Sequence, residues 1–464
     1  MSANTENKMG TGKISRLVLQ TGVPLMLSLL INSLYNFVDS VFVSHVSEDA
    51  LTALSLASPV QMLMSAVGCG IAVGLNAVIS KALGEKDREG VKRAASASLF
   101  LALCAGILLA VLGLTIVASY FKWQAGGNAV IEEYGTAYLQ ICMLFSIGQM
   151  GQWVFDRMVI ASGRSSLFLL TLSAASITNL ILDPILIFGW LGVPAMGTAG
   201  AALATVIGQC AGCAAGFLVN RTLNREIPIA FTLKPSWKSI FAILKVGIPT
   251  MLVQGVVSLL GIVMNSILIG FSTTAVAVYG VCLKIQGLAT VGVHGITLGE
   301  IPLIAFNFGA RKPERVHGTV KWAMCYGLGI FSVFLLALEL LPAAILRLFD
   351  ASPEMLAAGI SALRIFALTW LFSIPGMVLA SAFQGLSKGG CSMALTLTKQ
   401  AILPTAFVLA AASLHSLELV WLAFAAAELL SLPLGIILWR RVSGKTLGEN
   451  RTGKPMAPVL AARK

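Results

Sequence analysis

Charged residues are scarce in this sequence. Asp, Glu, Lys and Arg together make up 11% of its 464 residues, whereas soluble domains carry about 25%. Hydrophobic residues make up 57%, and the mean hydropathy is +0.87. This composition excludes an ordinary soluble domain and predicts an all-α membrane protein that crosses the bilayer many times.

Acidic residues are the scarcer of the two signs, with 20 Asp and Glu against 32 Lys and Arg. In a membrane protein such a basic excess gathers in cytoplasmic loops, so we expect no nucleic-acid partner. The first dozen residues are polar, and the apolar run after them is too long for a signal peptide and lacks a small-residue cleavage site. The sequence therefore predicts that the first span is retained.

Motifs for metal binding and catalysis are also missing. The eight cysteines all lie in apolar segments, and Cys210-Ala-Gly-Cys213 has no second pair nearby. Packing as small hydrophobic residues is favoured over a zinc or redox site. We find no HExxH motif, aspartate-rich pair or nucleophile elbow. An intramembrane enzyme is thus the least favoured class, and no cofactor is expected.

Long apolar runs are what the sequence does have. Runs of about 20 apolar residues indicate transmembrane helices, and twelve such spans are predicted. They lie near residues 15–44, 52–80, 94–119, 130–160, 166–190, 198–220, 240–270, 275–308, 318–345, 356–384, 391–412 and 418–440. The implied organisation is an N-terminal segment (1–13), an N-lobe (14–220), a polar linker (221–239), a C-lobe (240–441) and a disordered tail (442–464).

Basic residues fall in alternate loops. They precede the first span, join spans two and three, join spans eight and nine, and follow the twelfth: Lys8, Lys13, Arg16; Lys81, Lys86, Arg88, Lys92, Arg93; Arg311, Lys312, Arg315, Lys321; Arg440, Arg441, Lys445. The opposite loops, such as 189–197 and 272–274, hold almost none. By the positive-inside rule both termini are cytoplasmic.

The two halves are copies of each other. A gapless shift by 225 positions carries Pro24 onto Pro249. The same shift matches Gly22 with Gly247, Ser33 with Ser258, Gln61 with Gln286, Gly70 with Gly295 and Gly84 with Gly309. Six spans per copy is an even number, so both copies keep one orientation. The repeat predicts two six-helix lobes related by a pseudo-twofold axis along the membrane normal.

The first span carries a polar face that ends in an acid. Asn32, Tyr35, Asn36 and Asp39 fall together at 3.6 residues per turn. A charged side chain at bilayer depth costs at least about 2.5–3.5 kcal/mol, so a retained one indicates function. Such a face must contact protein or a water-filled cavity. We interpret it as the lining of a transport cavity.

A second acid lies in the fifth span, where Asn179 and Asp183 are one helical turn apart. The repeat carries Asp39 onto Met264, and at an offset of about 224 it carries Asp183 near Phe407, so both matching positions are apolar. Helix packing alone does not require that only the first half carries these two acids, whereas an ion- or proton-binding site confined to that half does. Two buried carboxyl groups can share a proton near neutral pH, or bind Na⁺ when both are ionised. The alternative for Asp183 is a polar helix end before Pro184.

Other polar residues at membrane depth are weaker candidates. With Tyr35 and Asn36, we assign Gln61, Gln254 and Lys284 to a substrate cavity. Lys284 is equally consistent with a structural partner for Glu300, and Glu428 has no partner by spacing. Pro24 weakens the helix ladder of the first span and offers a hinge.

Several of these motifs occur together in a known family. They are Tyr35–Asp39, Gly84, Gly309-Ala310-Arg311, Asn179 with Asp183-Pro184, and Gly200–Thr205. On these residues the chain resembles the MATE family of multidrug and toxin extruders, from Gly22 to about Arg441. The resemblance implies twelve helices in two lobes, and drug efflux by alternating access driven by H⁺ or Na⁺.

Within the family the chain is most similar to the DinF-like prokaryotic branch. That resemblance implies a coupling site of Asp39, Asn179, Asp183 and a threonine matched to Thr198, with a bend at Pro24. The NorM-like branch has acids on spans seven and ten, whereas here span seven has Gln254 and span ten has no acid. Proton coupling through the N-lobe is therefore favoured, with Na⁺ at Asp39, Asn179 and Asp183 as the alternative.

The resemblance also implies partners and location. We expect lipophilic cationic or zwitterionic compounds as substrates, and a monomer in a bacterial inner membrane. A flippase for lipid-linked oligosaccharides is the alternative function. Its cavity would need basic residues for pyrophosphate, and Lys284 is the only candidate.

Overall fold

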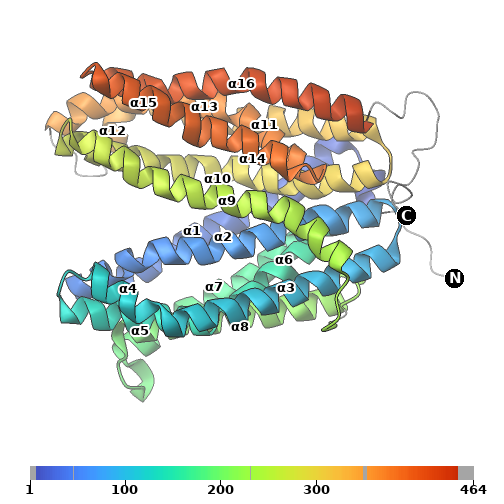
Figure 1. Cartoon of the computed structure of the whole chain (residues 1–464), viewed down its shortest axis with the longest axis horizontal. Coiled ribbons are helices and arrows are strands. Elements are labelled where there is room, and N and C mark those ends of the chain that lie inside the picture. Colours follow the sequence, from blue (N-terminus) through green and yellow to red (C-terminus); the bar gives the residue numbers. More distant parts are fainter. Residues whose placement is uncertain (1–6, 45, 230, 348–352, 448–464) are drawn as a thin grey trace. The chain divides into compact units, whose positions relative to one another are not determined.

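The computed structural model describes residues 7–44, 46–229, 231–347 and 353–447, and within these residues every regular element is a helix (Figure 1). Long apolar helices are expected for a chain in lipid, because each backbone N–H and C=O is then satisfied within its own segment. Eleven helices among the described residues are long and apolar enough to cross a membrane. The chain is thus an all-α membrane protein.

The helices of the first half follow the predicted spans closely. They are α1 (Ile14–Ser44), α2 (Glu48–Gly84), α3 (Arg88–Thr115), α4 (Val117–Gln124), α5 (Ala129–Leu144), α6 (Ser146–Ala161), α7 (Ser165–Phe188) and α8 (Gly197–Thr222), with short 3-10 turns at Lys8–Gly10 (η1) and Trp190–Gly192 (η2). The span predicted at 130–160 is broken at Phe145 into α5 and α6, each of 16 residues. Each piece is too short to cross a membrane by itself, so this span is absent from the eleven.

The second half repeats the pattern after the polar linker. Its helices are α9 (Trp237–Ile269), α10 (Thr273–Gly309), α11 (Pro313–Leu340), α12 (Pro342–Arg347), α13 (Pro353–Gly385), α14 (Gly389–Leu397), α15 (Leu403–Ser413) and α16 (Leu417–Leu447). A π-helical segment, η3 (Thr398–Ile402), joins α14 and α15 into one span. Helix α16 includes residues 442–447 of the predicted disordered tail, and residues 448–464 lie outside the described part.

The chain forms two compact units. The N unit comprises Gln20–Leu83 and Asp87–Ser258, and the C unit comprises the described residues of Met1–Leu19, Gly84–Lys86 and Leu259–Lys464. The boundaries fall inside α1 and α9, so each of these helices contributes to both units. In the C unit, Arg315 donates hydrogen bonds to the carbonyls of Met9 and Gly12, which attaches the start of the chain to α11.

Close helix contacts through small residues shape the N unit. A Cβ atom at Gly200 would lie 2.4 Å from the Leu186 carbonyl oxygen, and one at Gly208 would lie 2.8 Å from the Ala175 carbonyl oxygen. Glycine therefore lets α8 approach α7 at backbone distance, as small residues do in membrane helix pairs. This approach positions the polar side chains of α7 described below.

Aromatic side chains fill part of the C unit. The Phe366 ring lies 5.9 Å from Trp370, 5.7 Å from Trp421 and 5.1 Å from Phe424 between centroids. Trp370 and Trp421 are buried. These contacts hold α13 against α16, the two helices that later supply a buried polar site.

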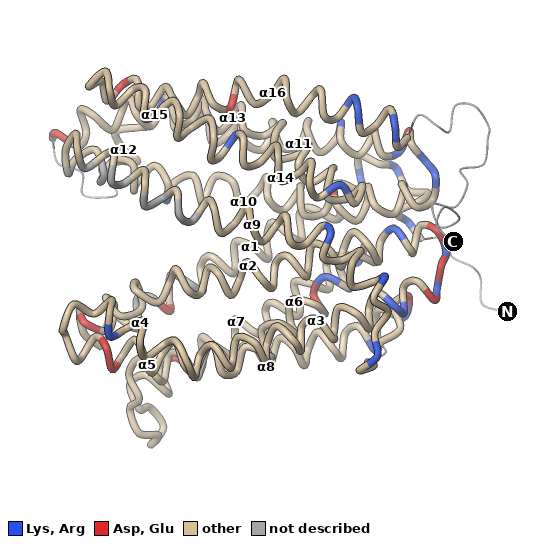
Figure 2. Tube along the Cα trace, viewed as in Figure 1, with Lys and Arg blue, Asp and Glu red and all other residues tan. Residues whose placement is uncertain are grey.

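Basic residues gather at one end of the helices in each unit taken by itself (Figure 2). In the N unit Lys81 and Arg221 lie in the last turns of α2 and α8. In the C unit Lys388 precedes α14 and Lys445 lies in the last turn of α16. This is the arrangement on which the predicted orientation depends.

Candidate functional site

The fifth predicted span carries a fully buried carboxylate. Asp183 on α7 is 0% exposed, and its Oδ1 accepts a hydrogen bond of 3.2 Å from Nδ2 of Asn179. The second oxygen, Oδ2, is buried and has no hydrogen-bond partner. Asn179 is 3% exposed, and its Oδ1 is also without a partner. A buried oxygen without a donor is costly, so these two atoms mark an incomplete polar site.

Asp39 on α1 belongs to the same site. Its carboxylate interacts electrostatically with that of Asp183, so the two acids lie near one another in the N unit. The Oδ1 atom of Asp39 is buried and accepts no hydrogen bond. Three residues from two helices thus present buried, unpartnered oxygens. Oxygen-only ligand sets suit a proton or a hard cation such as Na⁺.

The threonine beside this cluster is Thr205, not Thr198. Nδ2 of Asn179 lies 3.4 Å from the Thr205 hydroxyl, whereas the Thr198 hydroxyl donates to the carbonyl of Tyr134 at 3.3 Å. The two threonines are about two turns apart on α8, and only the inner one is level with Asn179. Thr205 ends the Gly200–Thr205 motif and precedes Gly208, whose Cβ would lie 3.0 Å from the Asn179 Cβ.

The glutamines assigned to a cavity form hydrogen bonds within the N unit. Nε2 of Gln61 donates to the hydroxyl of Tyr138 at 3.0 Å. The side chain of Gln254 bonds to Cys69. Tyr35 and Asn36 lie in α1, but their side chains are outside the described part of the structure.

Lys284 is exposed on α10 of the C unit. Glu300 on the same helix is 0% exposed, and its Oε2 accepts a hydrogen bond of 2.7 Å from Ser381 on α13. Glu300 therefore forms its hydrogen bond with Ser381, and not the ion pair with Lys284 that the sequence suggested as one possibility.

Pro24 lies inside α1, which continues through it. Its ring cannot donate to the helix ladder. The Ser28 hydroxyl donates to the Pro24 carbonyl at 2.8 Å, one turn further along. The region around this proline thus has fewer backbone hydrogen bonds than the rest of the helix.

Two buried features were not predicted from spacing. Lys399 is 2% exposed and forms an ion pair with Glu428, with 3.0 Å between Nζ and Oε1. Arg157 is buried in the N unit, lies over the Trp153 ring at 5.7 Å, and leaves Nη1 unpartnered. A lone charge in an apolar run was the available signal for Lys399 and for Glu428, whereas Arg157 directly follows Asp156, which favours a local ion pair. Lys399 and Glu428 are 29 positions apart in sequence, so helical spacing does not reveal their pairing.

Within the described residues, no group of three or more His, Cys, Asp and Glu side chains could hold a metal ion. The cluster of Asp39, Asn179 and Asp183 does not belong to that class of group, because Asn179 supplies an amide oxygen. Its ligands would all be oxygen atoms.

Helices, buried acids and small-residue packing together define a polytopic membrane transporter fold. A sequence model of the MatE family matches residues 24–185 and 249–408. The chain belongs to the MatE family of transporters, not to an enzyme family. The two matched segments start at the positions that the internal repeat predicts.

Curated relatives match most of the chain. Multidrug export protein MepA of Staphylococcus haemolyticus is 26% identical over 404 residues, covering 85% of this chain and 87% of the relative. The probable multidrug resistance protein NorM of Thermotoga maritima is 26% identical over 407 residues, covering 86% of each.

Solved structures share the fold. An outward-facing multidrug resistance MATE family transporter superposes with a TM-score of 0.87 at 24% identity, covering 97% of this chain and 100% of that chain. A MOP superfamily transporter from Pyrococcus furiosus gives the same TM-score and identity. The predicted MATE fold is confirmed, while the DinF-like branch stays a prediction.

Proposed function

We propose that this protein is a multidrug efflux antiporter that exports lipophilic, cationic or zwitterionic compounds by alternating access. The names of the curated relatives, a multidrug export protein and a probable multidrug resistance protein, support drug export. The observation that carries the coupling mechanism is the set of buried, unpartnered oxygens on Asp39, Asn179 and Asp183.

Protons are the coupling ion in this proposal. A carboxyl group removed from water favours its neutral form, and a second carboxylate nearby favours it further. A proton that binds one acid relieves the repulsion between Asp39 and Asp183 and supplies a donor to an oxygen that now lacks one. Release of that proton on the other side of the membrane restores the repulsion. The site thus has two states that differ in charge, as coupling requires.

Sodium is the alternative ion at the same oxygens. Both carboxylates would be ionised, and Asn179 Oδ1 would serve as a neutral ligand. Because Na⁺ and H⁺ would occupy the same oxygens, the two ions would compete, and a pH-dependent apparent affinity for Na⁺ would follow.

The remaining residues support binding and motion. In this proposal the cluster is oriented by Asn179 and Thr205. The substrate cavity is lined by Tyr35, Asn36, Gln61, Gln254 and Lys284. Pro24 is the hinge of α1. Alternating access requires the lobes at 14–220 and 240–441 to move against each other. We further propose that the protein acts as a monomer in the bacterial inner membrane, with both termini in the cytoplasm.

Ethidium efflux from cells tests the proposal. Asp39→Asn and Asp183→Asn should each abolish efflux at unchanged expression, because an amide cannot exchange a proton. Glu339→Gln, which breaks the exposed pair with Arg364 in the C unit, is the control and should retain efflux. Proton-driven efflux by either asparagine variant at the wild-type rate would contradict the proposed coupling site.

A further inference from the structure

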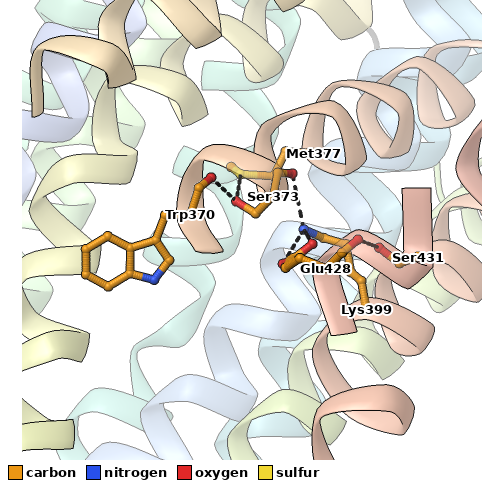
Figure 3. Close-up of polar contacts among 6 residues, drawn as sticks. All are labelled: Trp370, Ser373, Met377, Lys399, Glu428 and Ser431. Carbon is orange, nitrogen blue, oxygen red and sulfur yellow. Dashed lines mark hydrogen bonds and ion pairs between the residues drawn. The ribbon is translucent and has the colours of Figure 1, made fainter. Parts of the chain in front are cut away.

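The C unit contains a complete ion pair at membrane depth. Nζ of Lys399 lies 3.0 Å from Oε1 and 3.2 Å from Oε2 of Glu428, and it also donates to the carbonyl of Ser373 at 3.3 Å (Figure 3). Lys399 is 2% and Glu428 is 8% exposed. All three ammonium donors are used, and two of them go to the same carboxylate.

Such a pair is weak evidence for stability, because the cost of desolvating two ions offsets their attraction. An apolar pair would pack as well in a membrane protein. A retained charge inside a membrane span is therefore a sign of function. The proposed coupling acids belong to the N unit, whereas this pair belongs to the C unit.

The backbone around Lys399 is irregular. Lys399 lies in the π-helical segment η3, between α14 and α15. Single π turns in helices are frequent at functional sites. Opposite the lysine, Gly376 on α13 leaves room for the chain, since a Cβ there would lie 3.0 Å from Lys399 Cδ. The site is thus built from α13, η3 and α16 with space for the lysine side chain.

An open face of α10 lies next to this pair. Gly280, Gly287 and His294 recur at heptad spacing on one side of the helix, and a Cβ at either glycine would contact nothing within 4 Å. The His294 side chain has accessible surface in the middle of the span, while its Nδ1 lies 3.0 Å from the Thr290 carbonyl oxygen and the neighbours Val293 and Gly295 are buried. An exposed imidazole at this depth is expected to contact water, not lipid. His294 interacts electrostatically with Lys399, so the two lie near one another.

Few other charges face the pair. Helices α14 and α15 carry no Asp, Glu, Lys or Arg. On α13, Arg364 pairs with Glu339 of α11. On α16, Glu418, Arg440, Arg441 and Lys445 lie more than two turns from Glu428. On α10, which packs against α13, Lys284 is exposed and Glu300 is buried, with its Oε2 accepting a hydrogen bond from Ser381. The titratable groups to be considered at the site are therefore Lys399, Glu428, His294 and Glu300.

We propose that Lys399 and Glu428 form a proton-linked binding site for the anionic group of a lipophilic ligand. In the resting pair Glu428 neutralises the ammonium. When Glu428 takes up a proton, two of the three hydrogen-bond acceptors of Lys399 are weakened and the site carries one uncompensated positive charge. A carboxylate or sulfonate then restores neutrality, so proton uptake and anion binding favour each other reciprocally. The inference deepens the proposed efflux function, since it assigns the acidic end of a zwitterionic substrate.

Anion binding to the full chain in detergent or nanodiscs tests this inference. The probe is benzenesulfonate, which stays ionised across the pH range used, with benzenesulfonamide as the uncharged match. Calorimetric titrations at several pH values should show an affinity for the sulfonate that rises about tenfold per pH unit as pH falls through the titration of Glu428, as expected for one linked proton. The sulfonamide should show no such rise.

Three variants separate the outcomes. Glu428→Gln mimics the protonated site and should bind benzenesulfonate without pH dependence. Because this variant leaves a buried lysine unpaired and can fail to fold, the double variant Lys399→Met/Glu428→Met provides a charge-free site. It should fold and lose sulfonate binding. Glu339→Gln, which breaks the exposed pair with Arg364, is the control and should behave as wild type.

Equal sulfonate binding by wild type and by the double methionine variant would overturn the inference, as would wild-type affinity independent of pH. Ethidium efflux measured on the same variants keeps the proposed function distinguishable. Efflux retained by the double variant with no sulfonate binding in wild type would reject the anion site alone. Absence of ethidium efflux by the wild-type protein would reject the proposed function instead.

Discussion

At the scale of single residues, the site is defined by oxygens that lack donors. Asp39, Asn179 and Asp183 each present one in the N unit. The two acids could be found from sequence because each is a lone carboxylate in an apolar run. Asn179 could be found because it lies one turn before Asp183. None of this requires knowledge of how the helices pack.

Thr205 could not be chosen by the same reasoning. Thr198 and Thr205 lie on one face of one helix, about two turns apart, and spacing does not tell which is level with Asn179. The depth of a residue is set by how far α8 slides along α7, which is a property of tertiary packing. The structure selects Thr205, at 3.4 Å from Asn179 Nδ2.

The two threonines give a matched pair of variants. Thr205→Val removes a hydrogen-bond partner of Asn179, whereas Thr198→Val removes a bond to the Tyr134 carbonyl. A net hydrogen bond contributes about 0.5–1.5 kcal/mol, or about a two- to twelvefold change in affinity. We expect Thr205→Val to weaken the apparent affinity for the coupling cation by this factor, and Thr198→Val to leave it unchanged. Cation-dependent efflux rates at graded pH measure both. A larger effect from Thr198→Val would refute the placement.

At the scale of elements, the pairing of α7 with α8 supports the site. Gly200 and Gly208 bring the two helices to backbone distance, and Gly208 lies directly beside Asn179. The spans themselves were predictable from hydropathy to within a few residues. The break at Phe145 and the π-helical segment at Thr398–Ile402 were not, because both arise from local backbone geometry inside a continuous apolar run.

Gly208→Ala tests this support. The added Cβ would lie 2.8 Å from the Ala175 carbonyl oxygen and 3.0 Å from Asn179 Cβ, so α8 must move away from α7. Overpacking of this kind costs about 1–3 kcal/mol. We expect a lower melting temperature together with weakened coupling. Gly287→Ala, whose Cβ meets nothing within 4 Å, is the control and should leave both unchanged. Wild-type stability of Gly208→Ala would show that the helices do not pack as described.

At the scale of the whole molecule, duplication explains most of the architecture. The family match begins at residue 24 and again at residue 249, as the shift of Pro24 onto Pro249 predicts. The copies have diverged in their buried charges. The acids at Asp39 and Asp183 are found in one copy, and the Lys399–Glu428 pair in the other. The sequence comparison showed the first difference but missed the second, because the pair joins residues that are distant along the chain.

The predicted orientation belongs to this scale. Basic residues at one end of each unit indicate a cytoplasmic face. A fluorescent protein fused after Lys464 should fluoresce, and alkaline phosphatase inserted at Leu191, between α7 and α8, should be active in the periplasm. Inactive phosphatase at Leu191, with an active fusion at Lys86 between α2 and α3, would reverse the assignment.

Transport in proteoliposomes with pH and Na⁺ gradients imposed separately tests the central claim most directly. We predict that a pH gradient alone drives substrate movement by the wild-type protein and that Asp39→Asn abolishes it at unchanged incorporation into the vesicles. Transport of equal rate by wild type and by Asp39→Asn under the pH gradient would contradict the account.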